Sequence, residues 1–325
     1  MYKKFLSVSL FFSTFVLSGC FFFDTEIQRW HLAPQGSTNL SLSRDGRFAL
    51  VSTNTQGIVL WDLQQNKTLA DFGSQDQYHN SVITSHISDN SRYAITATSQ
   101  NFTVWDLGWS QSYGLWSIND AIIQDVAIAN NGTEVLLALN NGKALFIDLT
   151  DGRRLEFLAH CDKVNSVALS ANGRYALSGG NDHHAYLWDT HSGQIIYSFK
   201  HSSRVNQVAL QRDGKFAFSA AANNDAIIWD LTTGNKITQL AITLRHQTLS
   251  SVRFSDDGQF LVTGTPSRRV ELWRTDNGKN IGRWRAEVQP GARPATAVVY
   301  DVAISPTGNV VAGSSAGYAQ TWSTD

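Results

Sequence analysis

The chain has 325 residues, of which 42% are hydrophobic and 16% charged, and its net charge is −1. This length allows one to three domains, and the composition indicates a folded chain rather than a disordered or fibrous one. The near-neutral charge argues against nucleic-acid binding, which needs a surplus of Lys and Arg on one face. Two cysteines are too few for a disulfide scaffold.

The first twenty residues have the pattern of an export signal. Lys3 and Lys4 precede an apolar stretch, residues 5–17, that is too short to span a bilayer comfortably. The segment 17–20, Leu-Ser-Gly-Cys, resembles the lipobox of bacterial lipoproteins. That resemblance implies that residues 1–19 are removed as a signal peptide and that Cys20 becomes a diacylated N-terminus. Two or three acyl chains anchor a protein stably, because each buried CH₂ contributes about 0.8 kcal/mol.

The same resemblance implies a place in the cell. A lipidated Cys20, followed by a short tether over residues 20–25, would hold the chain on the periplasmic side of the bacterial envelope. Phe21 stands where inner-membrane lipoproteins of this kind carry Asp, which favours the outer membrane. Because lipid occupies Cys20, Cys161 would be the one remaining thiol and no intramolecular disulfide is expected. Without Lys3 and Lys4 the net charge becomes −3, which argues further against nucleic acid.

A repeat of 41 to 49 residues fills the rest of the chain. Before each landmark lies a short apolar segment followed by a turn, as in VALSANG, which ends at Gly173, 15 residues before Trp188. The segments between alternate apolar and polar residues, a period of two that predicts strands. The landmarks are Trp61-Asp62, Trp105-Asp106, Ile147-Asp148, Trp188-Asp189, Trp229-Asp230, Trp273-Arg274 and Trp322-Ser323.

Seven units of about four short strands resemble the WD-repeat family across residues 26–325. The resemblance implies one all-β domain, a seven-bladed propeller with four antiparallel strands in each blade. The last repeat stops at Trp322, after its third strand, whereas residues 26–33 precede the first repeat and read as a strand. We therefore expect this N-terminal strand to pair into the last blade, which would close the ring and remove an exposed edge. Deleting it should destabilise the whole domain.

One repeat is almost a consensus copy of the family pattern. The resemblance implies that His160, Ser178, Asp182 and Trp188 form the family's buried hydrogen-bonded tetrad. The other repeats are weaker. The next one keeps its His, Ser and Trp but has Asn223 at the aspartate position, so such blades are expected to rely on apolar packing.

Candidate chemistry is sparse. The cluster around His160 could hold Zn or Cu through Cys161, His183 and His184, but two of its members already belong to the tetrad. Cys161 beside His160 could also be a nucleophile, although no orienting partner or oxyanion hole is visible. We therefore expect neither a metal site nor a cofactor. Cys161 is more simply interpreted as a structural thiol.

A partner surface is the stronger hypothesis. The longest insertion, residues 285–297, has two Pro and should form a semi-rigid loop on the rim that bears His160. Trp109, between the second and third repeats, should lie at the opposite rim, as a partner anchor or packed beneath its loop. Several arginines are expected around this loop. Alternatively, they are only solvated charges in turns and bind no partner. The predicted partner-binding residues are Arg204, Arg245, Arg268, Arg269 and Arg293.

Two functional classes follow. The favoured one is a membrane-anchored, monomeric propeller that binds envelope proteins and has no catalytic activity. The alternative is an enzyme or a cofactor- or metal-binding protein that uses the central channel, as quinoproteins and lactonases do. The active sites of such propeller enzymes have carboxylates and His near the axis, whereas the inner strands here are mostly Val, Ala, Ile and Ser. Asp125 and Asp301 are the exceptions, expected to be solvated unless they bind a cation.

Overall fold

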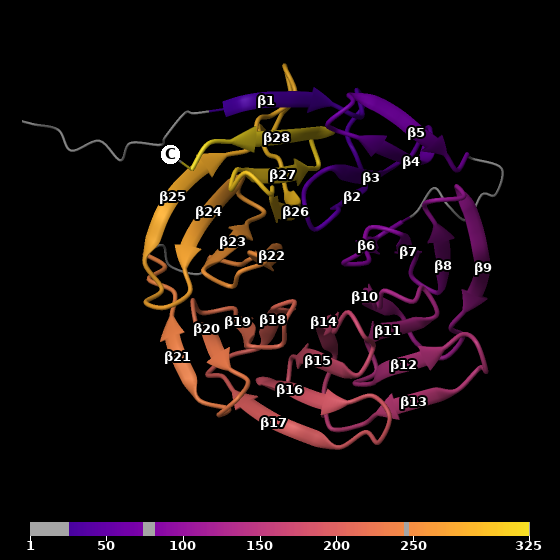
Figure 1. Cartoon of the computed structure of the whole chain (residues 1–325), viewed down its shortest axis with the longest axis vertical. Helices are drawn as coiled ribbons and strands as arrows, with labels where there is room; N and C mark the ends of the chain where they lie inside the picture. The colour runs from indigo at the N-terminus through magenta and orange to yellow at the C-terminus, as the bar shows by residue number, and fades with distance from the viewer. Residues whose placement is uncertain (1–25, 74–81, 244–246, 325) are drawn as a thin grey trace, which may run out of the picture.

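The computed structural model describes residues 26–73, 82–243 and 247–324. The predicted signal peptide, Cys20 and Arg245 lie outside these residues. The described chain consists of strands joined by turns and loops, with seven four-stranded antiparallel sheets arranged around one axis (Figure 1). The predicted fold class, an all-β propeller of seven blades, is confirmed.

Blades 1 to 3 follow one another along the chain, each running from its inner to its outer strand. Blade 1 comprises β2 (Asn39–Leu42), β3 (Phe48–Thr53), β4 (Gly57–Asp62) and β5 (Lys67–Asp71). Blade 2 comprises β6 (Thr84–Ile87), β7 (Tyr93–Ala97), β8 (Asn101–Asp106) and β9 (Gln111–Ser117). Blade 3 comprises β10 (Ile123–Ile128), β11 (Glu134–Leu139), β12 (Ala144–Asp148) and β13 (Arg154–Phe157).

Blades 4 to 6 repeat this order. Blade 4 comprises β14 (Val164–Leu169), β15 (Tyr175–Gly180), β16 (His184–Asp189) and β17 (Ile195–Lys200). Blade 5 comprises β18 (Val205–Leu210), β19 (Phe216–Ala221), β20 (Ala226–Asp230) and β21 (Lys236–Gln239). Blade 6 comprises β22 (Ser251–Phe254), β23 (Phe260–Gly264), β24 (Arg269–Arg274) and β25 (Asn280–Arg285).

Blade 7 joins the two ends of the described chain. Its strands β26 (Val299–Ile304), β27 (Val310–Ser314) and β28 (Tyr318–Trp322) come from the last repeat, and β1 (Glu26–His31) supplies the outer strand. The register pairs Glu26 with Trp322 and His31 with Tyr318. This arrangement agrees with the closure predicted from the sequence, and it removes the edge that β28 would otherwise expose.

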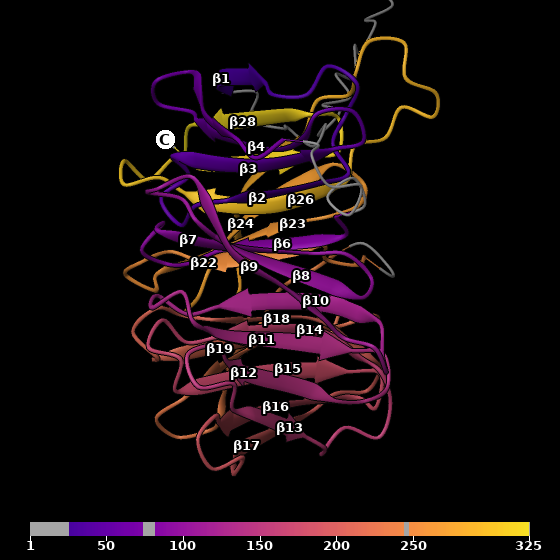
Figure 2. The ribbon, with the colours of Figure 1, turned by 90° about the vertical axis from the view of Figure 1, so that its right-hand side faces the viewer.

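The two rims of the ring differ. We call the rim where the inner strands begin the upper rim; it carries His160 and the loop 286–298 between β25 and β26. The lower rim is where the inner strands end, and it carries Trp109 in the turn after β8. The register of β1 places Glu26 on the lower rim as well, beside Trp322. In Figure 2 the loop after β25, coloured orange to gold, extends beyond one rim of the ring.

The hydrophobic core lies between the faces of neighbouring blades. Phe157 of blade 3 stacks on Trp188 of blade 4, with ring centroids 4.5 Å apart. In blade 3, where the repeat has no Trp, Ile147 is buried in a cluster shared with blade 2. Apolar packing thus replaces the aromatic landmark in that blade, as the sequence predicted.

Candidate functional site

The tetrad of blade 4 forms as the family resemblance implies. Asp182 accepts a hydrogen bond from His160 Nδ1 at 3.0 Å, and His160 Nε2 lies 2.9 Å from Ser178 Oγ. Trp188 Nε1 donates to the same hydroxyl at 3.2 Å. Burial pushes the pKa of Asp182 up, but the bonds from His160 and from backbone N–H groups leave it below its ordinary value. The Ser-His-Asp order is that of a hydrolase triad, yet Ser178 is fully buried and no substrate can reach it.

Blade 5 corrects the prediction made for its repeat. Asn223 does not occupy the aspartate position of a tetrad; its side chain donates to Ser202 Oγ at 2.7 Å. Asp225 replaces it, with Oδ2 3.2 Å from His201 Nδ1. His201 Nε2 contacts Ser219 Oγ at 2.7 Å, and Trp229 Nε1 donates to that oxygen at 2.8 Å. The turn thus brings in a carboxylate from two residues further along, and blade 5 does not rely on apolar packing alone.

Blades 2 and 6 retain half of the network. Trp105 Nε1 donates to Thr96 Oγ1 at 2.9 Å, and Trp273 Nε1 donates to Thr263 Oγ1 at the same distance. In both blades a Thr hydroxyl on the second strand takes the place of the Ser. The prediction of purely apolar packing was therefore too simple for blade 2.

The three proposed metal ligands all lie at the upper rim, as predicted, but their side chains do not surround one common position. Cys161 and His183 are exposed. His184 is half-buried: its Nδ1 lies 2.8 Å from the carbonyl oxygen of Asp182, and its ring stacks on Tyr186. Over residues 26–73, 82–243 and 247–324, no group of three His, Cys, Asp or Glu side chains is placed to hold a metal ion. Nothing in this geometry favours a metal site or an activated thiol.

The predicted rim arginines divide by environment. Arg204 and Arg293 are exposed, and Arg269 is half-buried at the start of β24. Arg268 Nε donates to the carbonyl oxygen of Ala286 at 2.8 Å, so this side chain holds the root of the loop 286–298. Its backbone has a φ of +72°, a left-handed conformation that is uncommon for a residue other than Gly.

Trp109 and Trp116, near opposite ends of β9, have different roles. The side chain of Trp109 is 73% exposed in its turn, so the packed interpretation is wrong. Trp116, at the end of β9, stacks on Phe102 with ring centroids 5.3 Å apart and belongs to the wall of blade 2. Trp109 is therefore the aromatic of this pair that is placed to meet a partner.

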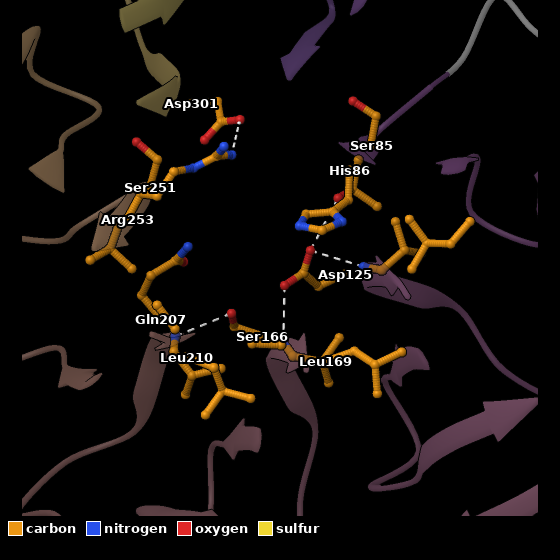
Figure 3. A pocket seen from close by; sticks show the side chains of 18 of the residues that line it. Ser85, His86, Asp125, Ser166, Leu169, Gln207, Leu210, Ser251, Arg253 and Asp301 are labelled. Atoms are coloured by element: carbon orange, nitrogen blue, oxygen red, sulfur yellow. Dashed lines mark hydrogen bonds and ion pairs between the residues drawn. The ribbon is translucent and has the colours of Figure 1, made fainter. Parts of the chain in front are cut away.

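The channel carboxylates are structural, and the expectation that they would be solvated is wrong. Asp125 accepts hydrogen bonds from Thr84 Oγ1 at 3.1 Å and from the Val167 backbone N–H at 3.0 Å, which links blades 2, 3 and 4 (Figure 3). Burial raises the pKa of Asp125. Asp301 similarly accepts from the Leu42 N–H at 2.8 Å. Their oxygens tie neighbouring blades together, so a cation site is not supported.

Sequence reasoning missed three basic groups near the axis. Arg253 donates to Asp301 at 2.9 Å, His86 lies on the neighbouring inner strand β6, and Arg44 follows β2. The alignment of the repeats contained the signal: His86 and Arg253 stand at the position that is Ala168 in blade 4. Burial lowers the pKa of His86, and the charge of Arg253 adds to this effect.

These features define the class: a closed seven-bladed propeller in which a Trp of the third strand donates to a Ser or Thr hydroxyl of the second strand inside blades 2, 4, 5 and 6. The family model of the WD40 repeat, described as WD domain, G-beta repeat, matches residues 152–189, 193–230 and 238–274. These are the segments that end in the landmarks of blades 4, 5 and 6. Together with the seven-bladed ring, these three matches support the WD-repeat β-propeller family, which suggests a protein-interaction scaffold.

A comparison with curated proteins gave no match. Among the residues that the structure describes, none forms a helix with the length and apolar character needed to cross a membrane.

Proposed function

We propose that this protein is a lipid-anchored scaffold of the bacterial envelope that binds other proteins through the upper rim of its propeller. The observation that carries this proposal is the loop 286–298, which is the longest connection on that rim and is fixed at its base. Its arginine, Arg293, is exposed, as is Arg204 on the same rim. Exposed loops on a rigid scaffold are common binding elements.

The root of the loop is held from two sides. Gln289 Nε2 donates to the carbonyl oxygens of Ala316 at 2.9 Å and Pro34 at 3.0 Å, while Arg268 holds Ala286. A loop fixed in this way loses little further conformational entropy when it meets a partner. Arg268 thus supports the binding surface, and Arg204, Arg269 and Arg293 are the residues that we propose contact the partner.

The anchor sets the orientation of the ring. If Cys20 carries lipid, five residues separate it from Glu26. The six Cα-to-Cα steps at about 3.3–3.6 Å each give a reach of about 20 Å. Glu26 begins β1 on the lower rim. We therefore propose that the lower rim, including Trp109, faces the membrane and that the upper rim faces the periplasm. Phe21 favours the outer membrane.

The anchor is tested by fractionation. Cys20→Ser should move the protein from the membrane fraction to the soluble periplasmic fraction and abolish incorporation of labelled palmitate. A variant that stays on the membrane without lipid would disprove the lipid anchor.

The partner surface is tested by cross-linking. A photo-crosslinking residue at Gly291, whose added Cβ would meet no atom within 4 Å, should capture an envelope protein in cells. Combined Arg204→Glu, Arg269→Glu and Arg293→Glu changes should abolish this capture. The matched control reverses three exposed charges on the lower rim, Lys67→Glu, Arg154→Glu and Lys279→Glu, and should leave capture intact. The opposite pattern would move the binding surface to the lower rim.

A further inference from the structure

The channel through the ring holds a cavity of about 320 Å³ with an uneven wall. On the side of blades 4 and 5 the inner strands present Ala168 and Ala209, which leave room. Blades 2 and 6, which lie across the channel from each other, carry His86 and Arg253 at the same register, and both residues line the cavity (Figure 3). The cavity is therefore open towards blades 4 and 5 and is flanked by a basic residue on either side.

Arg44 crosses the lower end of this cavity. Its guanidinium pairs with Asp89 of blade 2 at 3.1 Å and with Asp256 of blade 6, and its side chain is only 8% exposed. Arg212 of blade 5 also contacts Asp256, at 3.5 Å. These ion pairs tie the lower turns together across the axis, so the upper rim is the natural entrance to the cavity.

The wall has a surplus of hydrogen-bond donors. Among the described residues, two that line the cavity have a buried polar atom without a partner, Arg44 Nη2 and His86 Nδ1. Ser251 Oγ also has no partner, but it lies beside Gly264 and Val299, between blades 6 and 7. Arg253 uses Nη2 for Asp301, and its other N–H groups make no bond to a described residue. A buried polar group without a partner costs about 1–3 kcal/mol, so the atoms on the cavity wall call for an acceptor.

The carboxylates on the wall, Asp125 and Asp301, are already engaged. Both oxygens of Asp125 accept bonds, from Thr84 and Val126 on one side and from Val167 on the other. Both oxygens of Asp301 do so as well: Oδ1 accepts from its own strand, and Oδ2 accepts from blade 1 and from Arg253. A ligand that complements this wall must therefore bring acceptor oxygens of its own.

We propose that the channel binds a small oxyanion, a carboxylate or a phosphate. Arg253 and Arg44 supply cationic N–H donors, and the imidazole of His86 supplies a neutral one. The ligand enters from the upper rim and rests between His86 of blade 2 and Arg253 of blade 6. This site lies on the axis and does not depend on the lipid anchor or on the arginines of the rim.

Isothermal titration of the folded ring, residues 21–325, with inorganic phosphate and separately with citrate tests the proposal. Either anion should bind with a Kd below about 1 mM and raise the melting temperature with concentration, while chloride at equal ionic strength should not. Phosphate alone or citrate alone would identify the class. Absence of both heat and a melting shift for the two anions at about 10 mM overturns the proposal.

Variants assign the wall residues. His86→Phe should weaken binding about fivefold to tenfold without lowering the melting temperature of the ligand-free ring, because it removes an unpartnered ring nitrogen. The matched control is Ser251→Ala, which removes a buried, unpartnered hydroxyl that lies between blades 6 and 7, and binding should not change. Arg253→Gln should weaken binding more than His86→Phe, whereas Arg204→Gln should not. Unchanged affinity in His86→Phe refutes the assigned site even if Arg253→Gln fails to fold.

Discussion

The Nδ1 of His201 lies 3.2 Å from Oδ2 of Asp225, a carboxylate two residues beyond the position that the repeat pattern assigns to it. Asp225 pairs with a His whose other nitrogen and whose Ser and Trp partners keep the spacing of blade 4. The turn after β19 therefore accommodates a shift in the position of the acid while the strands hold the remaining three groups. The function of the carboxylate is kept although its place in the sequence is not.

This relationship makes Asp225 a stability residue. Asp225→Asn should lower the free energy of unfolding by about 1–3 kcal/mol, because a buried imidazole nitrogen loses its charged acceptor. The sequence alignment instead places Asn223 at the aspartate position. Asn223→Ala should lower the free energy of unfolding by less than about 0.5 kcal/mol, since Asn223 is exposed. Chemical denaturation of both variants measures the difference. A larger loss for Asn223→Ala would restore the alignment-based assignment.

Closure of the ring should depend on Trp30. This side chain is 8% exposed on β1 and packs into the cluster between blades 7 and 1. Trp30→Ala should cost about 3–5 kcal/mol, as for other buried aromatics. Ile27 of the same strand is 55% exposed, so Ile27→Ala is a matched control with an expected cost under about 0.5 kcal/mol. Equal melting temperatures for Trp30→Ala and the wild type would show that β1 is not needed to hold the ring.

The turn between β27 and β28 should be sensitive to a single methyl group. Gly317 has a φ of +76°, and an added Cβ would lie 2.0 Å from the carbonyl oxygen of Ala33. Gly152 has a φ of +77° and open space around it, so Gly152→Ala measures backbone strain alone, at about 1 kcal/mol. Gly317→Ala should cost clearly more, because the contact with the backbone is added. Similar melting temperatures for the two variants would contradict the close approach.

Stability should fall on mild acidification. Burial lowers the pKa of His201 below its ordinary value of 6.5, and Asp225 only partly opposes this effect. The unfolded chain therefore binds a proton first, so the stability present at neutral pH is lost as the pH falls below about 6.5. His86, also lowered by burial, acts in the same direction.

Melting temperatures between pH 7.5 and 5.5, a range above the titration of ordinary carboxylates, test this expectation. The slope should be shallower in His201→Gln, whereas the exposed His183→Gln should keep the slope of the wild type. A wild-type melting temperature that rises towards pH 5.5 would reverse the sign of the argument.

The local pattern of the sequence was sufficient to predict the propeller. Period-two strands, turn residues and the spacing of the Trp landmarks are properties of neighbours along the chain, and each blade folds from one such unit. Even the closing strand was predictable, since Trp322 left one strand missing and residues 26–33 offered one. The tetrad of blade 4 was implied by the family resemblance, and it forms because its members lie on or beside the strands of one sheet.

Contacts between blades required the tertiary structure. Whether Asp125 and Asp301 are solvated or bonded depends on which backbone N–H of the next blade they meet, and no repeat contains that information. The bridge from Arg44 to Asp89 and Asp256 joins turns that are far apart in sequence, across an axis that exists only in the closed ring. The sequence by itself thus determined the blades and their number. The ring decided which polar groups are paired and which remain open to a ligand, because pairing depends on distances between chain segments that only folding brings together.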